Sequence, residues 1–190
     1  MKNGQCLTLT ASVCNIIDLK LFQIYILGII DVRTREILCL SVTVYPNRNW
    51  IIQQFKNLAI DEKNFPRYLI IDNDAIYGSW IDPIMLDYFN IQILRISSGC
   101  PWQNSVMERY WKTLKEELIF RLHLQDESSI RYFCNKYRGY YNEIRPHQGI
   151  SGKSPIQLKT MESPVTNLQS VKYKKIKHAH GLFTEFKVAA

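Results

Sequence analysis

The sequence has no apolar run long enough to cross a membrane. A bilayer-spanning helix needs about 20 consecutive apolar residues, and no such stretch occurs in the 190 residues. The apolar segment 24–30 is short, and Asp31, Arg33 and Arg35 follow it. The N-terminus also lacks the apolar stretch that follows the basic start of a secretory signal. We therefore expect a protein that works in the cytoplasm and has no membrane partner.

Closely spaced cysteine pairs are missing as well. The chain has 5 cysteines, and no two have the spacing of a zinc knuckle or a redox-active pair. Free thiols in a reducing compartment are the expected state. The cysteines are Cys6, Cys14, Cys39, Cys100 and Cys134. Internal repeats and low-complexity segments are also absent, so the length indicates one globular domain.

Acidic residues are outnumbered. There are 24 lysines and arginines against 17 aspartates and glutamates, which gives a formal net charge of +7 and favours a polyanionic partner such as DNA. The excess is concentrated in residues 171–190, which carry 5 lysines and 1 acid. We expect the core domain over residues 1–160 and a basic C-terminal tail over residues 161–190. This tail is either a solvated end or a contact to nucleic-acid phosphates.

The pattern of apolar residues predicts an α/β fold. Strands are predicted over residues 7–17, 21–30, 36–44, 68–71 and 90–96. Helices are predicted over residues 50–60, 83–89, 104–122 and 126–142, the first of them capped by Asn49. The first three strands form an antiparallel meander, and the continuous apolar character of residues 68–71 indicates a parallel neighbour. We expect a mixed five-stranded sheet with helices on both faces.

Two carboxylates are placed for chemistry within this fold. Asp72 follows the apolar strand 68–71, and Glu108 lies near the start of the helix that begins at Asn104 or Ser105. There are 35 residues between the two acids. Carboxylate oxygens are suitable ligands for Mg²⁺ or Mn²⁺, and two such ions about 3.5–4 Å apart promote displacement at phosphorus. We therefore predict that Asp72 and Glu108 bind metal and act in catalysis.

Two lysines lie beside this predicted metal site. Lys112 and Lys115 follow Glu108 by four and seven residues, so all three share one face of a helix. We predict that these lysines bind DNA phosphates on either side of the reacting bond. The alternative is that they are solvated and balance Glu116 and Glu117.

Three segments resemble the catalytic core of DDE transposases and retroviral-type integrases. They are Ile71-Asp72-Asn73-Asp74, the run from Ser98 to Arg109 and the run from Tyr140 to His147. The last is similar to the YYN..RPH segment that closes this core in bacterial insertion-sequence transposases. The resemblance covers roughly residues 9–160. It implies an RNase H-like fold, two Mg²⁺ or Mn²⁺ ions, and metal-dependent cutting and joining of DNA.

The family uses three acids, and the first is missing from its expected place. When Tyr25 is aligned with the tyrosine of the family's second strand, the expected Asp falls on Ser12. Residues 11–15 contain no acid, and the nearest candidate for the third catalytic and metal-binding acid is Asp18. Asp18 fits only if the connection between the first two strands is shorter than in relatives, and otherwise it is a solvated turn residue. The neutral Ser12 cannot supply the negative charge that the metal ions need.

Several other polar and aromatic residues have two interpretations. Asp74 either supports Asp72 or is a surface charge. The aromatic-rich segment 132–141 is expected to pack in the core rather than to stack on bases. Arg145 and His147 resemble family positions, and the alternative is that they cap the end of the preceding helix without binding DNA.

The main hypothesis is an integrase or transposase core for DNA integration and transposition. It would bind the element ends and the target DNA, hydrolyse a strand and join the 3′-hydroxyl to the target. No helix-turn-helix precedes the core, so we expect end recognition to reside in another domain or chain. The resemblance also implies a homo-oligomer on DNA, at the nucleoid. The alternatives are a DNA-binding remnant with a broken metal site and an RNase H-like nuclease that cuts RNA–DNA hybrids.

Overall fold

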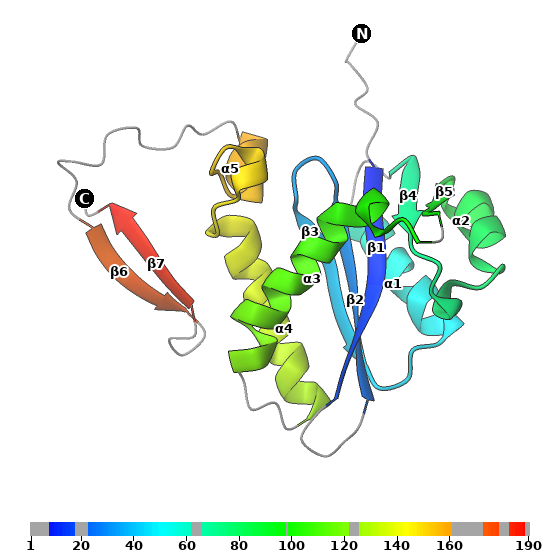
Figure 1. The fold of residues 1–190 in the computed structure, drawn as a ribbon, viewed down its shortest axis with the longest axis horizontal. Coiled ribbons are helices and arrows are strands. Elements are labelled where there is room, and N and C mark those ends of the chain that lie inside the picture. Colours follow the sequence, from blue (N-terminus) through cyan, green and yellow to red (C-terminus); the bar gives the residue numbers. More distant parts are fainter. Residues whose placement is uncertain are drawn as a thin grey trace, which may run out of the picture.

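The centre of the molecule is a five-stranded sheet with the strand order β3-β2-β1-β4-β5 (Figure 1). The strands are β1 (Thr8–Ile17), β2 (Gln23–Asp31), β3 (Ile37–Thr43), β4 (Tyr68–Ile71) and β5 (Gln92–Arg95). The structure is a computed structural model that describes residues 8–17, 23–61, 66–97, 99–121, 126–160, 173–178 and 183–188. Each of the five strands lies where the sequence predicts one.

The sheet is mixed. Strands β1, β2 and β3 form an antiparallel meander, whereas β4 is parallel to both β1 and β5. The apolar strand β4 lies between two parallel neighbours, which explains why it contains no charged residue. The ladder between β1 and β4 ends with Ala11 opposite Ile71. Ser12 and Asp72 are therefore the next residues of two adjacent parallel strands.

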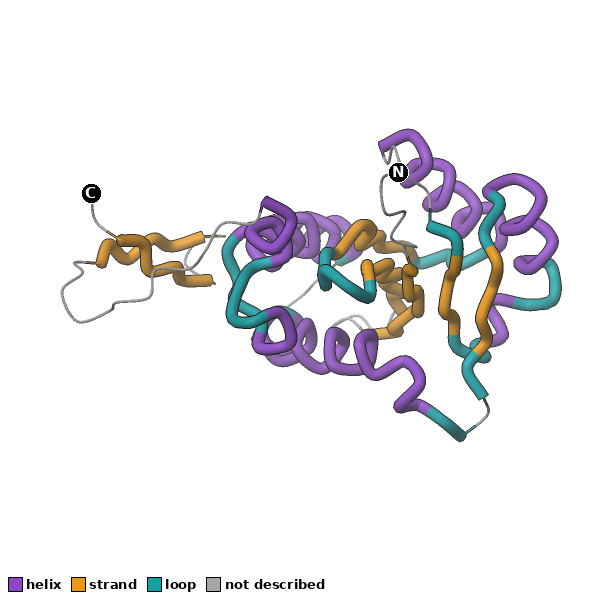
Figure 2. The backbone as a smooth tube through the Cα atoms, turned by 90° about the horizontal axis from the view of Figure 1, so that it is seen from above, coloured by secondary structure: helices purple, strands orange, loops and turns teal. Residues whose placement is uncertain are grey.

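Helices cover both faces of the sheet, as predicted (Figure 2). Buried apolar residues of α1 and α2 pack in one core cluster, and those of α3 and α4 pack in another. The helices are α1 (Arg48–Asp61), α2 (Ile81–Phe89), α3 (Ser105–Glu117), α4 (Glu127–Glu143) and α5 (Pro155–Thr160). On α4, Tyr137 and Tyr141 are buried, while Tyr132 at its outer side is exposed. The aromatic segment therefore serves mainly to pack α4 on the sheet.

Helix boundaries differ from the prediction by up to five residues, most clearly at the start of α1 and the end of α3. Helix α1 begins at Arg48, and the side chain of Asn47, rather than that of Asn49, accepts a hydrogen bond from the backbone N–H of Trp50 at 2.9 Å. Asn47 is the capping residue because it stands one position before the helix. Helix α3 ends at Glu117, and a 3₁₀ turn over Ile119–Arg121 follows it. The apolar periodicity continues through this turn, so the sequence alone suggested a longer helix.

The basic C-terminal segment contains a separate two-stranded antiparallel sheet. It consists of β6 (Tyr173–His178) and β7 (Phe183–Val188). Residues 161–172 lie outside the described part of the chain, so the division into a core over 1–160 and a tail over 161–190 stays a prediction. Among the described helices, none combines the length and the apolar character that a membrane span requires.

Candidate active site

Ser12 and Asp72 are in direct contact at the end of the β1–β4 ladder. The Ser12 hydroxyl donates a hydrogen bond to Asp72 Oδ2 at 2.6 Å. Ser12 is only 6% exposed, so its hydroxyl is fixed in place rather than free in solvent. The residue of the first strand that faces Asp72 is therefore a serine, at the position where the family resemblance puts an acid.

The backbone after β4 holds Asp72 from the other side. The backbone N–H of Asp74 donates to Asp72 Oδ1 at 3.1 Å. The carboxylate of Asp74 accepts from the backbone N–H of Ile76 at 3.0 Å and caps the 3₁₀ turn Ala75–Tyr77. The Asn73 side chain donates to the carbonyl of Ile96 at 2.8 Å, which links the ends of β4 and β5. Asp74 thus contacts Asp72 through its backbone, while its exposed side chain caps the turn.

Helix α3, which carries Glu108, is fixed to the sheet at two points. Buried Asn104, directly before the helix, accepts a hydrogen bond from the Thr10 hydroxyl of β1 at 2.5 Å. Further along, Trp111 packs over Gly28 of β2, where an added Cβ would lie 3.0 Å from the indole ring. Gly28 is also the partner of Ser12 in the β1–β2 ladder. Glu108 lies between these two anchors, on the face of the sheet to which Thr10 points.

Lys112 and Lys115 have different surroundings on α3. Lys112 is 76% exposed and lies 4.0 Å from Glu116, which is one of the pairings that its solvated alternative predicts. Lys115 is half-buried beside Cys14 of β1. Burial raises the pKa of the Cys14 thiol, and the neighbouring Lys115 partly offsets that rise.

A cleft of about 270 Å³ runs along β1 next to Ser12. Its walls come from β1, β2, the segment after β4 and α3. They are Val13, Cys14, Asn15, Tyr25, Asp74, Trp111 and Lys115. Lys115 therefore lies in a concave site that Asp74 also lines, whereas Lys112 lies on the open surface.

The position of Asp18 lies outside the described residues, so its assignment as the third acid stays a prediction. Strand β1 continues without a break to Ile17. That residue is five positions beyond Ser12, or roughly 17 Å along an extended strand. No group of three His, Cys, Asp or Glu side chains arranged to hold one metal ion occurs in the described part of the chain.

The chemistry of the remaining donors fits a divalent cation, but with few anionic ligands. Asp72 and Glu108 offer the hard carboxylate oxygens that Mg²⁺ and Mn²⁺ prefer. Ser12 offers only a neutral hydroxyl, and that hydroxyl already donates to Asp72. The predicted donors among the described residues thus amount to two carboxylates and one neutral hydroxyl, fewer anionic ligands than a pair of closely spaced ions needs.

Arg145 and His147 are part of the structure around the far end of α3. Arg145 makes a two-pronged ion pair with Glu117, with nitrogen–oxygen distances of 2.7 and 3.0 Å. His147 is buried against Tyr141, whose carbonyl lies 3.4 Å from His147 Nε2. These residues join α3 to the segment after α4, which is more than the helix-capping role that the sequence suggests.

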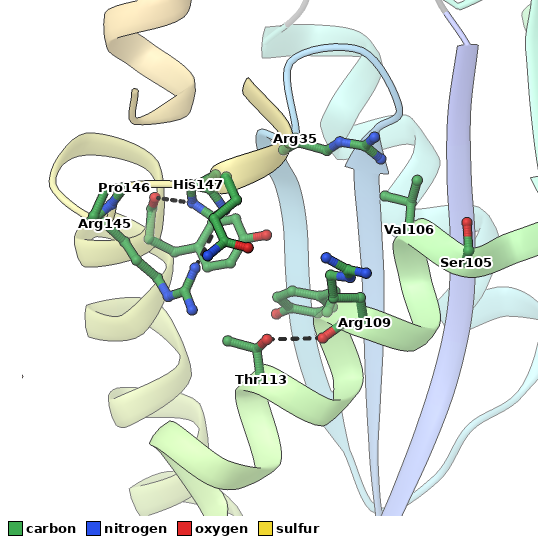
Figure 3. A pocket seen from close by; sticks show the side chains of 12 residues that line it. Arg35, Ser105, Val106, Arg109, Thr113, Arg145, Pro146 and His147 are labelled. Atoms are coloured by element: carbon green, nitrogen blue, oxygen red, sulfur yellow. Dashed lines mark hydrogen bonds between the residues drawn. The ribbon is translucent and has the colours of Figure 1, made fainter. Parts of the chain in front are cut away.

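Two arginines near this segment are not among the predicted site residues. Arg35 and Arg109 line a pocket of about 570 Å³ together with Arg145 and His147 (Figure 3). Arg109 directly follows Glu108, and Arg35 lies in the charged turn between β2 and β3. Their spacing of 74 positions in the chain hides their proximity. The charged residues of the β2–β3 turn were the only feature of the sequence that could have indicated this pocket.

Comparison with known proteins agrees with these features. Residues 89–155 match the model of a family described as an integrase core domain. The chain is 29% identical over 134 residues to the transposase for insertion sequence element IS904 of Lactococcus lactis subsp. lactis (strain IL1403). That match covers 70% of this chain and 53% of the transposase, so the chain spans about half of its relative's length.

Similar folds occur among solved structures of viral integrases. The HTLV-2 integrase catalytic core domain in complex with magnesium, in its dimeric form, has a TM-score of 0.62 and 16% identity over 82% of this chain and 99% of that chain. The catalytic core domain of BIV integrase has a TM-score of 0.59 and 14% identity over 81% of this chain and 93% of that chain. A simian T-cell lymphotropic virus intasome has a TM-score of 0.64 at 14% identity, covering 95% of this chain and 66% of that one.

The likeness to integrase cores shows that the five-stranded mixed sheet and its helices form an RNase H-like fold. The family match covers the segment that contains Glu108, α3 and the Tyr140–His147 run. Asp72 precedes the residues that this family model matches. Residues 89–155 match the integrase core domain family, and the chain is similar in sequence to an insertion-sequence transposase and in fold to integrase catalytic cores.

Proposed function

We propose that this chain binds DNA and acts on it as the core of an insertion-sequence transposase. The observation that carries the proposal is the placement of Asp72 at the end of β4 and of Glu108 on a helix anchored to the same face of the sheet. The substrates are the ends of the mobile element and the target DNA. The reaction is hydrolysis of a phosphodiester, which frees a 3′-hydroxyl. This hydroxyl then attacks a target phosphodiester, forms a new P–O bond and releases a 3′-hydroxyl of the target.

In this proposal the carboxylates bind the metal ions and the lysines bind the phosphates of the DNA. Asp72 is oriented by the Ser12 hydroxyl and by the Asp74 backbone N–H. Lys115, in the cleft along β1, would bind a phosphate next to the reacting one, and Lys112 a phosphate at the rim. Asp72 and Glu108 would hold Mg²⁺ or Mn²⁺, with Asp18 proposed as the third ligand. When bound, the metal supplies activation of the attacking oxygen and stabilisation of the leaving one.

The Ser12–Asp72 hydrogen bond favours a second candidate function. If serine replaces the first acid and Asp18 does not compensate, the site lacks one negative charge and binds metal weakly. Phosphoryl transfer relies on such charge for most of its catalysis, so cleavage would be lost while the fold and DNA binding remain. The chain would then be a DNA-binding remnant of a transposase.

Cleavage of labelled element-end DNA in Mn²⁺ tests both candidates. The wild type is compared with Asp72→Asn, Asp18→Asn and Ser12→Asp, on duplex DNA and on an RNA–DNA hybrid. Nicking and strand transfer that Asp72→Asn abolishes support the active core, and loss through Asp18→Asn identifies Asp18 as a ligand. Binding without nicking, together with nicking gained in Ser12→Asp, identifies the remnant. Nicking that Asp72→Asn leaves unchanged refutes the assignment, and preference for the hybrid supports the nuclease.

We further propose that the chain works as a homo-oligomer on DNA, in the cytoplasm and at the nucleoid. Two observations support assembly on DNA: the similar fold in a viral intasome and the similar fold in a dimeric form of an integrase core. Mass photometry with and without element-end DNA tests this. A single copy per DNA end under all conditions would contradict the proposal.

A further inference from the structure

A basic pocket lies on the side of α3 that points away from Glu108. On a helix with 3.6 residues per turn, Ser105, Arg109 and Thr113 form one flank, and Glu108 with Lys112 and Lys115 forms another. The first flank faces a pocket of about 570 Å³ whose other walls are the β2–β3 turn and the segment after α4. Figure 3 shows Arg35, Arg109 and Arg145 around this pocket, each from a different part of the chain.

The pocket carries uncompensated positive charge. Its lining includes three arginines and no acid. Arg145 is neutralised because it pairs with both oxygens of Glu117. The structure assigns the guanidinium groups of Arg35 and Arg109 no hydrogen bond or ion pair with any described side chain. Two positive charges therefore face the same space without a partner in this part of the chain.

Two titratable groups in the pocket, His147 and Tyr141, are kept uncharged by burial. Burial, reinforced by Arg145, lowers the pKa of His147 to about 4, so this imidazole is uncharged near neutral pH. Burial raises the pKa of Tyr141 to about 12, a rise that Arg145 and Arg35 partly offset. Arg35 lines the same pocket as both rings. The charge of the pocket is therefore set by its arginines alone over the physiological range.

The backbone at Arg35 is held in a costly conformation. Its φ is +66°, in the left-handed region that residues with a Cβ rarely adopt. The turn is fixed by the backbone N–H of Arg35, which donates to the Asp31 carbonyl at 2.8 Å. The Asp31 side chain also accepts from the backbone N–H of Arg33 at 2.8 Å. These contacts fix the backbone of Arg35 at the wall of the pocket.

We propose that this pocket binds a backbone phosphate of the DNA strand whose reacting phosphate lies at Asp72 and Glu108. The inference rests on the proposed function for the identity of the anion, and on Arg35 and Arg109 for the site. Arginine recognises phosphate through two parallel N–H donors, and two arginines from different elements surround a tetrahedral anion better than one.

The dimensions of α3 relate the two sites. Neighbouring residues on a helix point about 100° apart, so the flank of Arg109 and the flank of Glu108 are separated by less than the full helix width of about 10–12 Å. Along one DNA strand, successive nucleotides advance about 3.4 Å. A strand that crosses α3 therefore has a phosphate within about three nucleotides of the reacting one in reach of Arg35 and Arg109. An acidic side chain of a second copy is the competing occupant.

The test is DNA binding by Arg35→Asn/Arg109→Gln. Asparagine tolerates the left-handed backbone at position 35, and Arg109 is exposed, so the fold should persist. The control is Arg67→Gln, an exposed arginine at the end of β4 opposite to Asp72. Fluorescence anisotropy with a short labelled DNA duplex is measured without metal, at salt concentrations from about 50 to 200 mM.

We expect the double variant to bind DNA roughly tenfold more weakly or worse, since a hydrogen bond to a charged group contributes about 1.5–3 kcal/mol. The slope of log K against log salt should fall by about 0.9, the value for one lost phosphate contact. DNA should also protect Arg109 of the wild type, but not Arg67, from an arginine-selective dicarbonyl reagent read by peptide mass spectrometry.

The outcomes separate this inference from the proposed function. If the wild type binds DNA and the double variant behaves like Arg67→Gln, the pocket inference is overturned and the proposed function stands. If the wild type does not bind DNA at any salt, both are overturned. If the double variant keeps its DNA affinity and instead converts a dimer to a monomer, the pocket binds an acidic group of a second copy and the inference also fails.

Discussion

Ser12→Asp is the substitution that examines the site most directly. Ser12 Oγ lies 2.6 Å from Asp72 Oδ2, and Ser12 is 6% exposed. A carboxylate at this position would face a second carboxylate at about 4 Å or less, where two unit charges repel by about 4 kcal/mol at an effective dielectric constant of 20. The existing hydrogen bond to a charged group would also be lost.

Without metal, we therefore expect the free energy of unfolding of the variant to be about 2–4 kcal/mol lower than that of the wild type at pH 7. Repulsion raises the pKa of at least one carboxyl, so the pair takes up a proton and part of the penalty disappears as the pH falls. Asp72→Asn in the same background should remove the penalty, because only one negative charge then remains. Ser12→Asn serves as the matched neutral control of similar size.

Divalent metal should reverse the effect. Three carboxylates around one cation bind it more tightly than two, and a ligand at a hundred times its Kd stabilises a folded protein by about 2.7 kcal/mol. For a chain of this size, that corresponds to a rise in Tm of about 5–10 °C. The assay is thermal unfolding followed by circular dichroism, with MnCl₂, MgCl₂ or neither, for the wild type and the variants. Nicking of element-end DNA is measured in parallel.

The reasoning is refuted if Ser12→Asp is as stable as Ser12→Asn without metal and gains no more stability from Mn²⁺. Ser12 would then not face Asp72 as the structure has it. A gain in Tm that also occurs in Ser12→Asp/Asp72→Asn would show that the added carboxylate binds metal elsewhere.

Three further outcomes follow from contacts around the site. Gly28→Val should lower the unfolding free energy by about 1–3 kcal/mol, since its side chain would collide with Trp111, and a chemical denaturation curve measures this. Asn104→Ala should cost about 1–3 kcal/mol by leaving the Thr10 hydroxyl buried without its acceptor, whereas Asn104→Asp should retain most of the stability. His147 has a folded pKa of about 4, below its unfolded value near 6.5. The unfolded state therefore binds more protons between these values, so wild-type stability should fall by about 3 kcal/mol from pH 7 to below pH 4 through this residue. A neutral His147→Gln should lose less over that range, and equal losses would contradict the assignment.

The strands and helices of the core follow from the sequence because local patterns and global packing agree there. The continuous apolar run of β4 required burial on both sides, and the structure places it between parallel neighbours. Asp126 was recognisable as a helix start, and its side chain accepts from the backbone N–H of Ser129 at 2.7 Å. Helix ends were less predictable. Asn47 and Asn49 are both suitable caps by type, and only the backbone decides between them.

The site was predictable in part for the same reason. Asp72 is predictable because it directly follows an apolar strand. Glu108 is predictable because it lies in the first turn of a helix. The contact between Ser12 and Asp72 joins residues 60 positions apart, and it depends on the register of two parallel strands. A shift of one residue would turn Ser12 to the other face. No local pattern encodes that register, so Ser12 could be identified only through the resemblance to known proteins. No resemblance of this kind indicated the arginine pocket.

Helix α3 is tied down along its whole length: at Asn104 by Thr10, at Trp111 by the surface of Gly28 and at Glu117 by Arg145. A helix fixed at both ends and in the middle cannot roll or slide without breaking one of these contacts. The distance between groups bound on its two flanks therefore stays constant. A DNA strand bound on both flanks would span this fixed distance with a whole number of nucleotides. The distance, rather than recognition of a base, would then determine which phosphodiester lies at Asp72 and Glu108.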